Sequence, residues 1–113
     1  MRISSYAFGK IVIDGVAYTS DVIVYPGRVE DSWWRKKGHR LAIDDLNAVW
    51  RERPETLVVG TGCYGYMAVP EATREAILAK GVDLHAVTTD EAVTLFNKLA
   101  AAGKVVAALH LTC

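Results

Sequence analysis

Apolar and polar positions change their spacing about halfway along the chain. Before residue 44 they follow the two-residue period of half-buried strands, as in residues 39–43. Residues 10–13 and 16–18 flank Asp14-Gly15, a dipeptide that favours the tight turn of a β-hairpin. Further extended segments are expected at residues 21–25, which stop at Pro26-Gly27, and at residues 29–35 and 39–43.

After residue 44 the spacing becomes helical. Asp44 or Asp45 can cap a first helix that ends at Pro54, and a second helix would begin at Pro70 and end before Gly81. A third helix would follow Thr88, whose side chain forms a capping box with Glu91, and would stop at Gly103. Apolar runs at residues 57–59, 84–87 and 105–111 are expected to be strands.

The order of these elements predicts an α/β fold. A strand-rich half is followed by one helix and then by a β-α-β-α-β series, and such alternation implies crossovers and a parallel core. The early hairpins would either extend that sheet or cover it. No linker or repeat divides residues 1–113, so a single domain is expected. On the third helix, Asn97 follows the apolar Phe96, and it would face solvent or make a polar contact.

Composition limits the classes of function. Apolar residues make up 51% of the chain and charged residues 23%, as in an ordinary soluble globular domain, and the formal net charge is zero. Nucleic-acid binding is therefore not favoured. No apolar run is long enough to cross a bilayer, and the first residues do not resemble a signal peptide, so a cytoplasmic location without membrane contact is expected. Two cysteines give neither a disulfide framework nor a zinc motif, and no metal site is predicted.

A glycine-rich loop follows the strand at residues 57–59 and spells G-x-G-x-x-G over residues 60–65. A dinucleotide is not expected there, because four residues separate Gly65 from the proline that begins the helix, and no acidic residue stands at the end of the next strand. No cofactor is predicted. Two interpretations remain: a turn that needs positive φ angles, or a backbone nest for a small anion. The candidate ligand loop comprises Gly60, Thr61, Gly62, Cys63 and Gly65.

Cys63 lies inside this loop, where backbone dipoles can activate a thiol. A nucleophilic cysteine needs a base, and the three histidines supply the choices: His85 and His110 lie in apolar strands and resemble core residues, whereas His39 is expected to be exposed. If the last strand runs parallel to residues 57–59, Cys113 reaches the same sheet edge as Cys63. The pair would then be neighbouring redox thiols or merely small apolar fillers.

One basic-aromatic cluster stands out, and it supplies a candidate partner rim of Trp33, Trp34, Arg35 and His39. On a strand the two tryptophans face opposite sides, so one would be core and the other would lie at a rim, with Arg35 on the same face as Trp33. An aromatic side chain beside arginine is typical of protein-binding sites.

Several short motifs together resemble the adipogenesis-associated Mth-type domain family, whose mitochondrial members include an assembly factor for respiratory complex I. The matching segments are Val24-Tyr25-Pro26-Gly27, Ser32-Trp33-Trp34-Arg35, Gly38-His39, Asp45-Leu46, Val59-Gly60-Thr61-Gly62, Gly65-Tyr66-Met67, Thr88 with Ala92-Val93, Phe96-Asn97 and Leu109-His110-Leu111-Thr112-Cys113. The resemblance implies a three-layer domain with a central mixed sheet on which helices and a β-hairpin pack. It implies no enzymatic activity, cofactor or catalytic residue.

The leading hypothesis is a non-catalytic binding or assembly module that takes a protein partner at the rim. The alternative is a small-molecule or anion site at the glycine loop, with thiol chemistry at Cys63. Exposed strands would allow a homodimer through edge pairing, and a monomer is equally compatible with the sequence.

Overall fold

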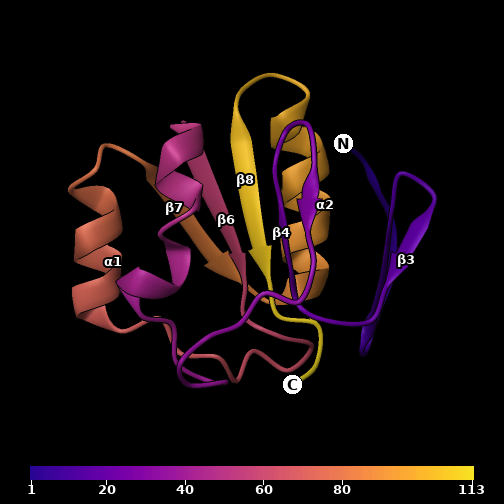
Figure 1. The fold of residues 1–113 in the computed structure, drawn as a ribbon, viewed down its shortest axis with the longest axis horizontal. Helices are drawn as coiled ribbons and strands as arrows, with labels where there is room; N and C mark the ends of the chain where they lie inside the picture. The colour runs from indigo at the N-terminus through magenta and orange to yellow at the C-terminus, as the bar shows by residue number, and fades with distance from the viewer.

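The computed structural model describes residues 1–113 and contains two sheets, two α-helices and two short 3-10 helices (Figure 1). In chain order the elements are β1 (Ile3–Ala7), β2 (Lys10–Ile13), β3 (Val16–Tyr18), β4 (Val22–Val24), β5 (Val29–Glu30), η1 (Ile43–Leu46), η2 (Val49–Glu52), β6 (Thr56–Gly60), α1 (Glu71–Leu78), β7 (Asp83–Val87), α2 (Thr89–Ala100) and β8 (Val105–Leu109).

The main sheet has five strands in the order β5-β4-β8-β6-β7. β6 pairs in parallel with both β7 and β8, whereas β4 runs antiparallel to β8 and to β5. β8 therefore lies at the centre and joins the antiparallel half of the sheet to the parallel half. All five of its residues are buried, as its continuous apolar sequence predicts.

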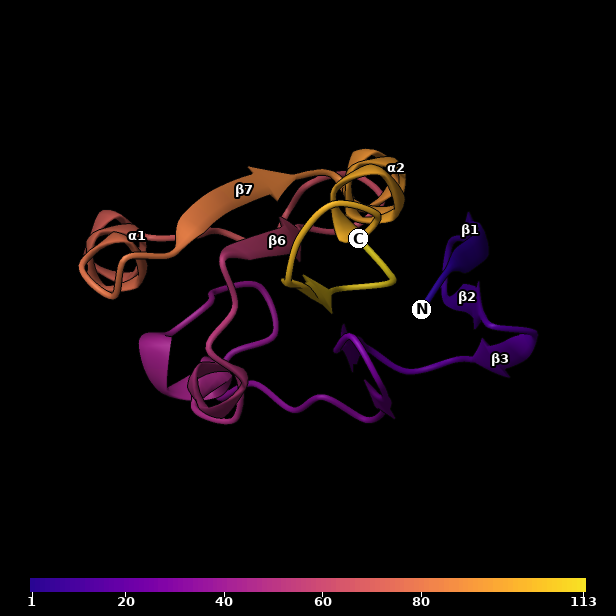
Figure 2. The same cartoon turned by 90° about the horizontal axis from the view of Figure 1, so that it is seen from above.

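Alternate residues of the central strands enter two different cores. Leu57, Val59 and Val106 face a cluster completed by α1 and by residues 33–49, whereas Val58 and Val105 face a cluster completed by α2 and the N-terminal strands. Figure 2 shows α2 on one side of the main sheet and the 3-10 segments on the other. The predicted three-layer α/β domain with a mixed central sheet is confirmed.

The N-terminal strands cover the main sheet instead of extending it. They form a separate three-stranded antiparallel sheet in the order β1-β2-β3, and Asp14-Gly15 makes the predicted hairpin turn with φ angles of 48° and 81°. β1 was not expected from the sequence. It is fastened to α2 by Asn97, whose Oδ1 accepts the Ile3 N–H at 3.0 Å and whose Nδ2 donates to the Ile3 carbonyl at 2.7 Å.

Four local predictions are wrong. No strand forms at residues 39–43, where Arg40 makes only isolated bridges to Lys37 and Ala68 and Ile43 already begins η1. β5 covers only two residues, because Ser32 leaves the extended conformation with a φ of 54° and its N–H donates to the Ser20 hydroxyl. Beyond it the Trp33 indole N–H donates to the Asp45 carbonyl, and the Arg35 guanidinium donates to the Gly38 carbonyl. The expected helix before Pro54 consists of two 3-10 helices, η1 and η2. Thr88 occupies the N-cap position of α2, but its side chain makes no capping hydrogen bond.

No helix is both long and apolar enough to cross a membrane. The remaining predicted elements lie where the sequence placed them: β6 and β7, α1 after Pro70, α2 after Thr88, and Gly81 beyond the end of α1 with a positive φ of 77°. The carboxyl ends of β6 and β8 point to the same edge of the sheet, where the glycine loop and the last residues of the chain follow (Figure 1).

Asn97→Ala should loosen the N-terminal sheet, because both polar main-chain groups of Ile3 would lose their partner. We expect the free energy of unfolding to fall by about 2 kcal/mol, and hydrogen exchange to accelerate in β1 to β3 before it does in β8. Lys98→Ala is the matched control on an exposed neighbour. Equal exchange rates in both variants would contradict a fastening role for Asn97.

Candidate functional site

Three segments that lie far apart in the sequence meet at the carboxyl edge of β6 and β8. They are the glycine loop after β6, residues 33–41 and the C-terminal residues. The Cys63 N–H donates to the Thr112 carbonyl at 2.6 Å, the Tyr66 N–H to the Cys113 carbonyl at 3.0 Å and the Ala68 N–H to the His39 carbonyl at 2.8 Å. The expectation that Cys63 and Cys113 reach the same edge is thus met by their backbones.

The backbone N–H groups of the glycine loop are used inside the chain. Thr61 N donates to the Val87 carbonyl, Gly62 N to the Thr89 hydroxyl, Cys63 N to the Thr112 carbonyl and Gly65 N to the Gly62 carbonyl. An anion nest needs such groups to be free. None of the five surface hollows is lined by the predicted loop residues. The geometry therefore favours the other interpretation, a tight crossing, over an anion nest.

Close packing explains the glycines at this crossing. A Cβ atom on Gly60 would lie 2.8 Å from Oγ1 of Thr89, and one on Gly62 would lie 2.6 Å from the carbonyl oxygen of Cys113. Gly62 also has a φ of 108°, and Gly65 has a φ of 72°. Thr89 completes the crossing, because its hydroxyl donates to the His110 carbonyl at 2.6 Å while accepting the Gly62 N–H.

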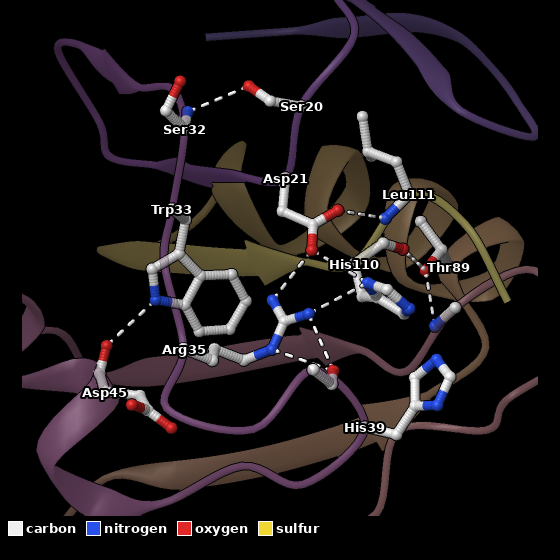
Figure 3. A network of polar contacts seen from close by, with 12 residues as sticks. Ser20, Asp21, Ser32, Trp33, Arg35, His39, Asp45, Thr89, His110 and Leu111 are labelled. Atoms are coloured by element: carbon white, nitrogen blue, oxygen red, sulfur yellow. Dashed lines mark hydrogen bonds and ion pairs between the residues drawn. The ribbon is translucent and has the colours of Figure 1, made fainter.

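A largely buried polar network lies beside this crossing and centres on the half-buried Asp21 (Figure 3). Oδ1 of Asp21 accepts the Leu111 N–H at 2.7 Å. Oδ2 lies 2.8 Å from Nδ1 of His110 and 2.8 Å from Nη1 of Arg35, the latter as an ion pair and not as an aligned hydrogen bond. Burial alone would raise the pKa of Asp21, but these hydrogen bonds outweigh it and hold the pKa below its ordinary value.

The network fixes the state of the His110 ring. A carboxylate only accepts hydrogen bonds, so Nδ1 of His110 carries a proton and donates it to Asp21. Nη2 of Arg35 also lies 3.1 Å from this nitrogen, but a protonated nitrogen cannot accept a hydrogen bond from it. Nε2 of His110 is buried and has no partner.

The two strand histidines differ in their surroundings. His110 is only 5% exposed, which confirms the expectation of a hydrogen-bonded core histidine at this position. The same expectation is wrong for His85, which is exposed because β7 is an edge strand.

The predicted partner rim divides between interior and surface. Trp33 and Arg35 are 7% and 8% exposed, and the guanidinium lies 4.6 Å from the centre of the Trp33 ring, so they share a face as predicted. That face points inward, however, because Arg35 pairs with Asp21. Trp34 is 75% exposed and His39 is also exposed, which leaves these two at the surface.

The two thiols have different surroundings. Sγ of Cys113 lies 3.7 Å from Nε2 of His39. Cys63 instead lies beside Tyr6, whose hydroxyl donates to the Leu111 carbonyl at 2.7 Å. Burial, then the neighbouring Cys63 and Asp90, raise the pKa of Tyr6 above its ordinary value. Cys113, not Cys63, is therefore the thiol with an imidazole beside it. The structure contains no group of His, Cys, Asp or Glu side chains suited to a metal ion.

A surface of three aromatic rings borders the glycine loop. Phe8, in the turn between β1 and β2, Tyr64 and Tyr66 are 55%, 63% and 64% exposed. The ring centres are 6.1 Å apart for Phe8 and Tyr64, and 5.9 Å apart for Tyr64 and Tyr66. The C-terminal residues hold these two segments together, because the Gly9 N–H donates to the Leu111 carbonyl and the Tyr66 N–H to the Cys113 carbonyl. We call these three side chains the aromatic surface.

Sequence reasoning missed several residues of this region. Asp21 was seen only as the start of a strand, and Tyr6, Phe8 and Thr89 carried no motif. Tyr64 and Tyr66 did carry a signal, because two tyrosines that flank a loop glycine cannot both be buried easily. The contact of Tyr64 with Phe8 spans 56 residues of chain, and no local pattern indicates it.

Comparisons with known proteins agree on the family and the fold. The model of a family described as "Protein of unknown function (DUF498/DUF598)" matches residues 3–110. A conserved hypothetical protein, PH1505, from Pyrococcus horikoshii OT3 is 28% identical over the whole of both chains, with a TM-score of 0.85. The protein MT938 is also 28% identical, over 99% of this chain and 98% of its own, with a TM-score of 0.81.

A third structure has the same fold at lower identity. It is a Bordetella pertussis protein described as a Mth938-like domain, which is 22% identical over 97% of this chain and 85% of its own, with a TM-score of 0.67. This likeness concerns the fold alone.

Asp21→Asn should destabilise the protein by about 3 kcal/mol at neutral pH, because Arg35 would be left buried beside an uncharged amide. The pKa of Asp21 is lowered by folding, so the carboxylate stabilises the fold above the ordinary aspartate value of about 3.9. That contribution disappears as the pH falls through the lower folded-state pKa. Urea unfolding at several pH values should show the two proteins converging under acid, and a constant difference would contradict this origin.

Gly62→Ala should be more harmful than an ordinary glycine substitution, because the new Cβ meets the Cys113 carbonyl and the φ angle is positive. We expect a loss of about 3 kcal/mol or more, combining overpacking with backbone strain. Gly27→Ala is the control, since a Cβ there would meet nothing within 4 Å and no positive φ is required. Thermal unfolding of the two variants measures the difference; equal midpoints would contradict the tight crossing.

Proposed function

The chain belongs to the DUF498/DUF598 family, the Mth938-type family that its motifs resemble, and from its own surface we propose that it acts as a protein-binding module. The observation that supports this proposal is the aromatic surface of Phe8, Tyr64 and Tyr66. A row of three large rings, in which Tyr64 contacts both Phe8 and Tyr66 and each ring is more than half exposed, is rare on a surface without a partner and is typical of binding hot spots.

The position of these rings also favours a binding role. They lie on a turn and a loop whose backbones are fixed by hydrogen bonds to the C-terminal residues, so little conformational entropy would be lost on binding. No hollow opens at the glycine loop, which argues for a flat protein partner over a small ligand.

The charge beside the aromatic surface indicates the kind of partner. Residues 36–40 include Lys36, Lys37 and Arg40, all exposed and none paired with an acidic side chain. This basic segment runs beside the loop that carries Tyr66, since Arg40 pairs with Ala68. A partner with an apolar centre and an acidic rim would complement the aromatic surface and the basic segment. A second copy of the chain remains an alternative occupant.

Photo-cross-linking in the living host tests the proposal. A benzophenone amino acid at Tyr66 should give one discrete cross-linked product, and the same probe at Leu78 on α1, which is 52% exposed, should not. Phe8→Ser combined with Tyr64→Ser should abolish the product, because truncation of a hot-spot aromatic costs about 2 kcal/mol or more. The mass of the product distinguishes a homodimer from a different partner.

Two results would contradict the proposal. One is the same products from the probes at Tyr66 and Leu78, and the other is a product that survives loss of both Phe8 and Tyr64. Circular dichroism of the double variant, compared with Leu78→Ser, confirms that the fold persists, which is expected because all three side chains are exposed.

A further inference from the structure

We propose that Cys113 is a reversible thiol-modification site, at which His39 accepts the thiol proton and the thiolate exchanges with a low-molecular-weight disulfide. The site is assembled by the fold, because Cys113 and His39 come from opposite halves of the sequence. Sγ of Cys113 and Nε2 of His39 are 3.7 Å apart, a distance suited to a thiol–imidazole contact, and the Cys113 side chain is partly exposed. This inference does not depend on the aromatic surface.

His110 provides the second, independent observation. It is 5% exposed, and its buried Nε2 has no hydrogen-bond partner. Its ring meets the ring of His39 edge-on, with centres 5.5 Å apart and planes at 72°. Figure 3 shows the unpartnered nitrogen on the side of the His110 ring that is turned toward His39. A buried polar atom without a partner is costly and calls for an explanation, of which a catalytic or redox role is one.

The orientation of His110 explains why His39 would take a proton. Nδ1 of His110 donates to Asp21, so Nε2 presents a lone pair when the ring is neutral. This lone pair adds negative potential on the side of the ring turned toward His39 and so favours the imidazolium that forms when His39 removes the proton from Cys113, without a hydrogen bond between the two rings. Charged side chains near this pair include Asp21 and Arg35, which neutralise each other behind His110, and Arg40, which follows His39 in the chain. His110 is thus a positioning residue.

The exchange reaction is balanced without a metal, because the disulfide RSSR is the oxidant: Cys113 is oxidised to the disulfide level while one sulfur of RSSR is reduced to a thiol. Nε2 of His39 takes the proton of the Cys113 thiol, and the thiolate attacks one sulfur of the disulfide RSSR. A new bond forms between Sγ and that sulfur, the original sulfur–sulfur bond breaks, and RS⁻ leaves with the electron pair. The imidazolium of His39 then returns the proton to give RSH. The products are the mixed disulfide of Cys113 and one molecule of thiol.

Cys63 does not share this arrangement and therefore serves as an internal comparison. Its neighbour is Tyr6, a phenol whose pKa is raised above its ordinary value by burial and by Cys63 itself. Such a phenol stays protonated and is no base. We therefore propose thiol chemistry at Cys113 in place of Cys63, which the glycine loop had suggested.

The test uses the full chain in two single-cysteine forms, Cys63→Ser and Cys113→Ser, with oxidised glutathione and 5,5′-dithiobis(2-nitrobenzoate) as probes. At pH 7 the Cys63→Ser protein should react about tenfold faster than an unstructured cysteine peptide, as expected of a thiol with a neighbouring imidazole. His39→Gln in that background should remove the advantage and return the pH–rate profile to that of the peptide. The same change in the Cys113→Ser protein should leave the slower Cys63 reaction unaltered.

Two kinetic outcomes would overturn the proposal: an unchanged rate and pH profile after His39→Gln, or a Cys113 reaction no faster than that of the peptide. His39 is exposed and belongs to neither hydrophobic cluster, so His39→Gln should fold, and its circular dichroism verifies this. Intact mass after treatment with oxidised glutathione should show one added glutathionyl group on the Cys63→Ser protein, removable with dithiothreitol. A protein that stays unmodified would likewise overturn the proposal.

Discussion

The region at the carboxyl ends of β6 and β8 depends on the hydrogen bonds and the ion pair of one side chain, the carboxylate of Asp21. The carboxylate accepts hydrogen bonds from the Leu111 main-chain N–H and from Nδ1 of His110, and it forms an ion pair with Arg35. These partners belong to the C-terminal residues and to the segment after β5, so one side chain before β4 holds together parts of the chain separated by 14 to 90 residues. An ion pair in this interior setting is tolerable only because each oxygen of the carboxylate is satisfied.

The sequence predicted well whatever is decided by local pattern. The alternation of apolar residues located β6 and β8, Asp14-Gly15 located the hairpin turn, and Pro70 with Gly81 delimited α1. It failed where distant groups compete with local preference. Thr88 is a residue type that often caps helices, yet its side chain makes no capping hydrogen bond. The neighbouring Thr89 hydroxyl instead bonds the His110 carbonyl and the Gly62 N–H, which come from distant parts of the chain.

The same distinction separates the two parts of the candidate site. The glycine loop was recognised from its sequence motif. Its N–H groups, however, donate to the carbonyls of Val87 and Thr112, and no spacing in the sequence connects these residues to the loop. Trp33 and Arg35 were correctly placed on one face, although the sequence could not say that a carboxylate lies on the inner side. Charge that looks free in a sequence is often neutralised by a residue far away, and Asp21 is such a residue.

The central position of β8 has a consequence for synthesis of the protein. β4 and β6 never touch each other in the main sheet, since each pairs with β8 on one side. During translation both strands emerge well before β8 and must wait with an open edge. The two halves of the sheet therefore join only after residue 109 has left the ribosome. Until then the unpaired backbone edges of β4 and β6, together with their apolar side chains, are open to chaperones and to neighbouring nascent chains.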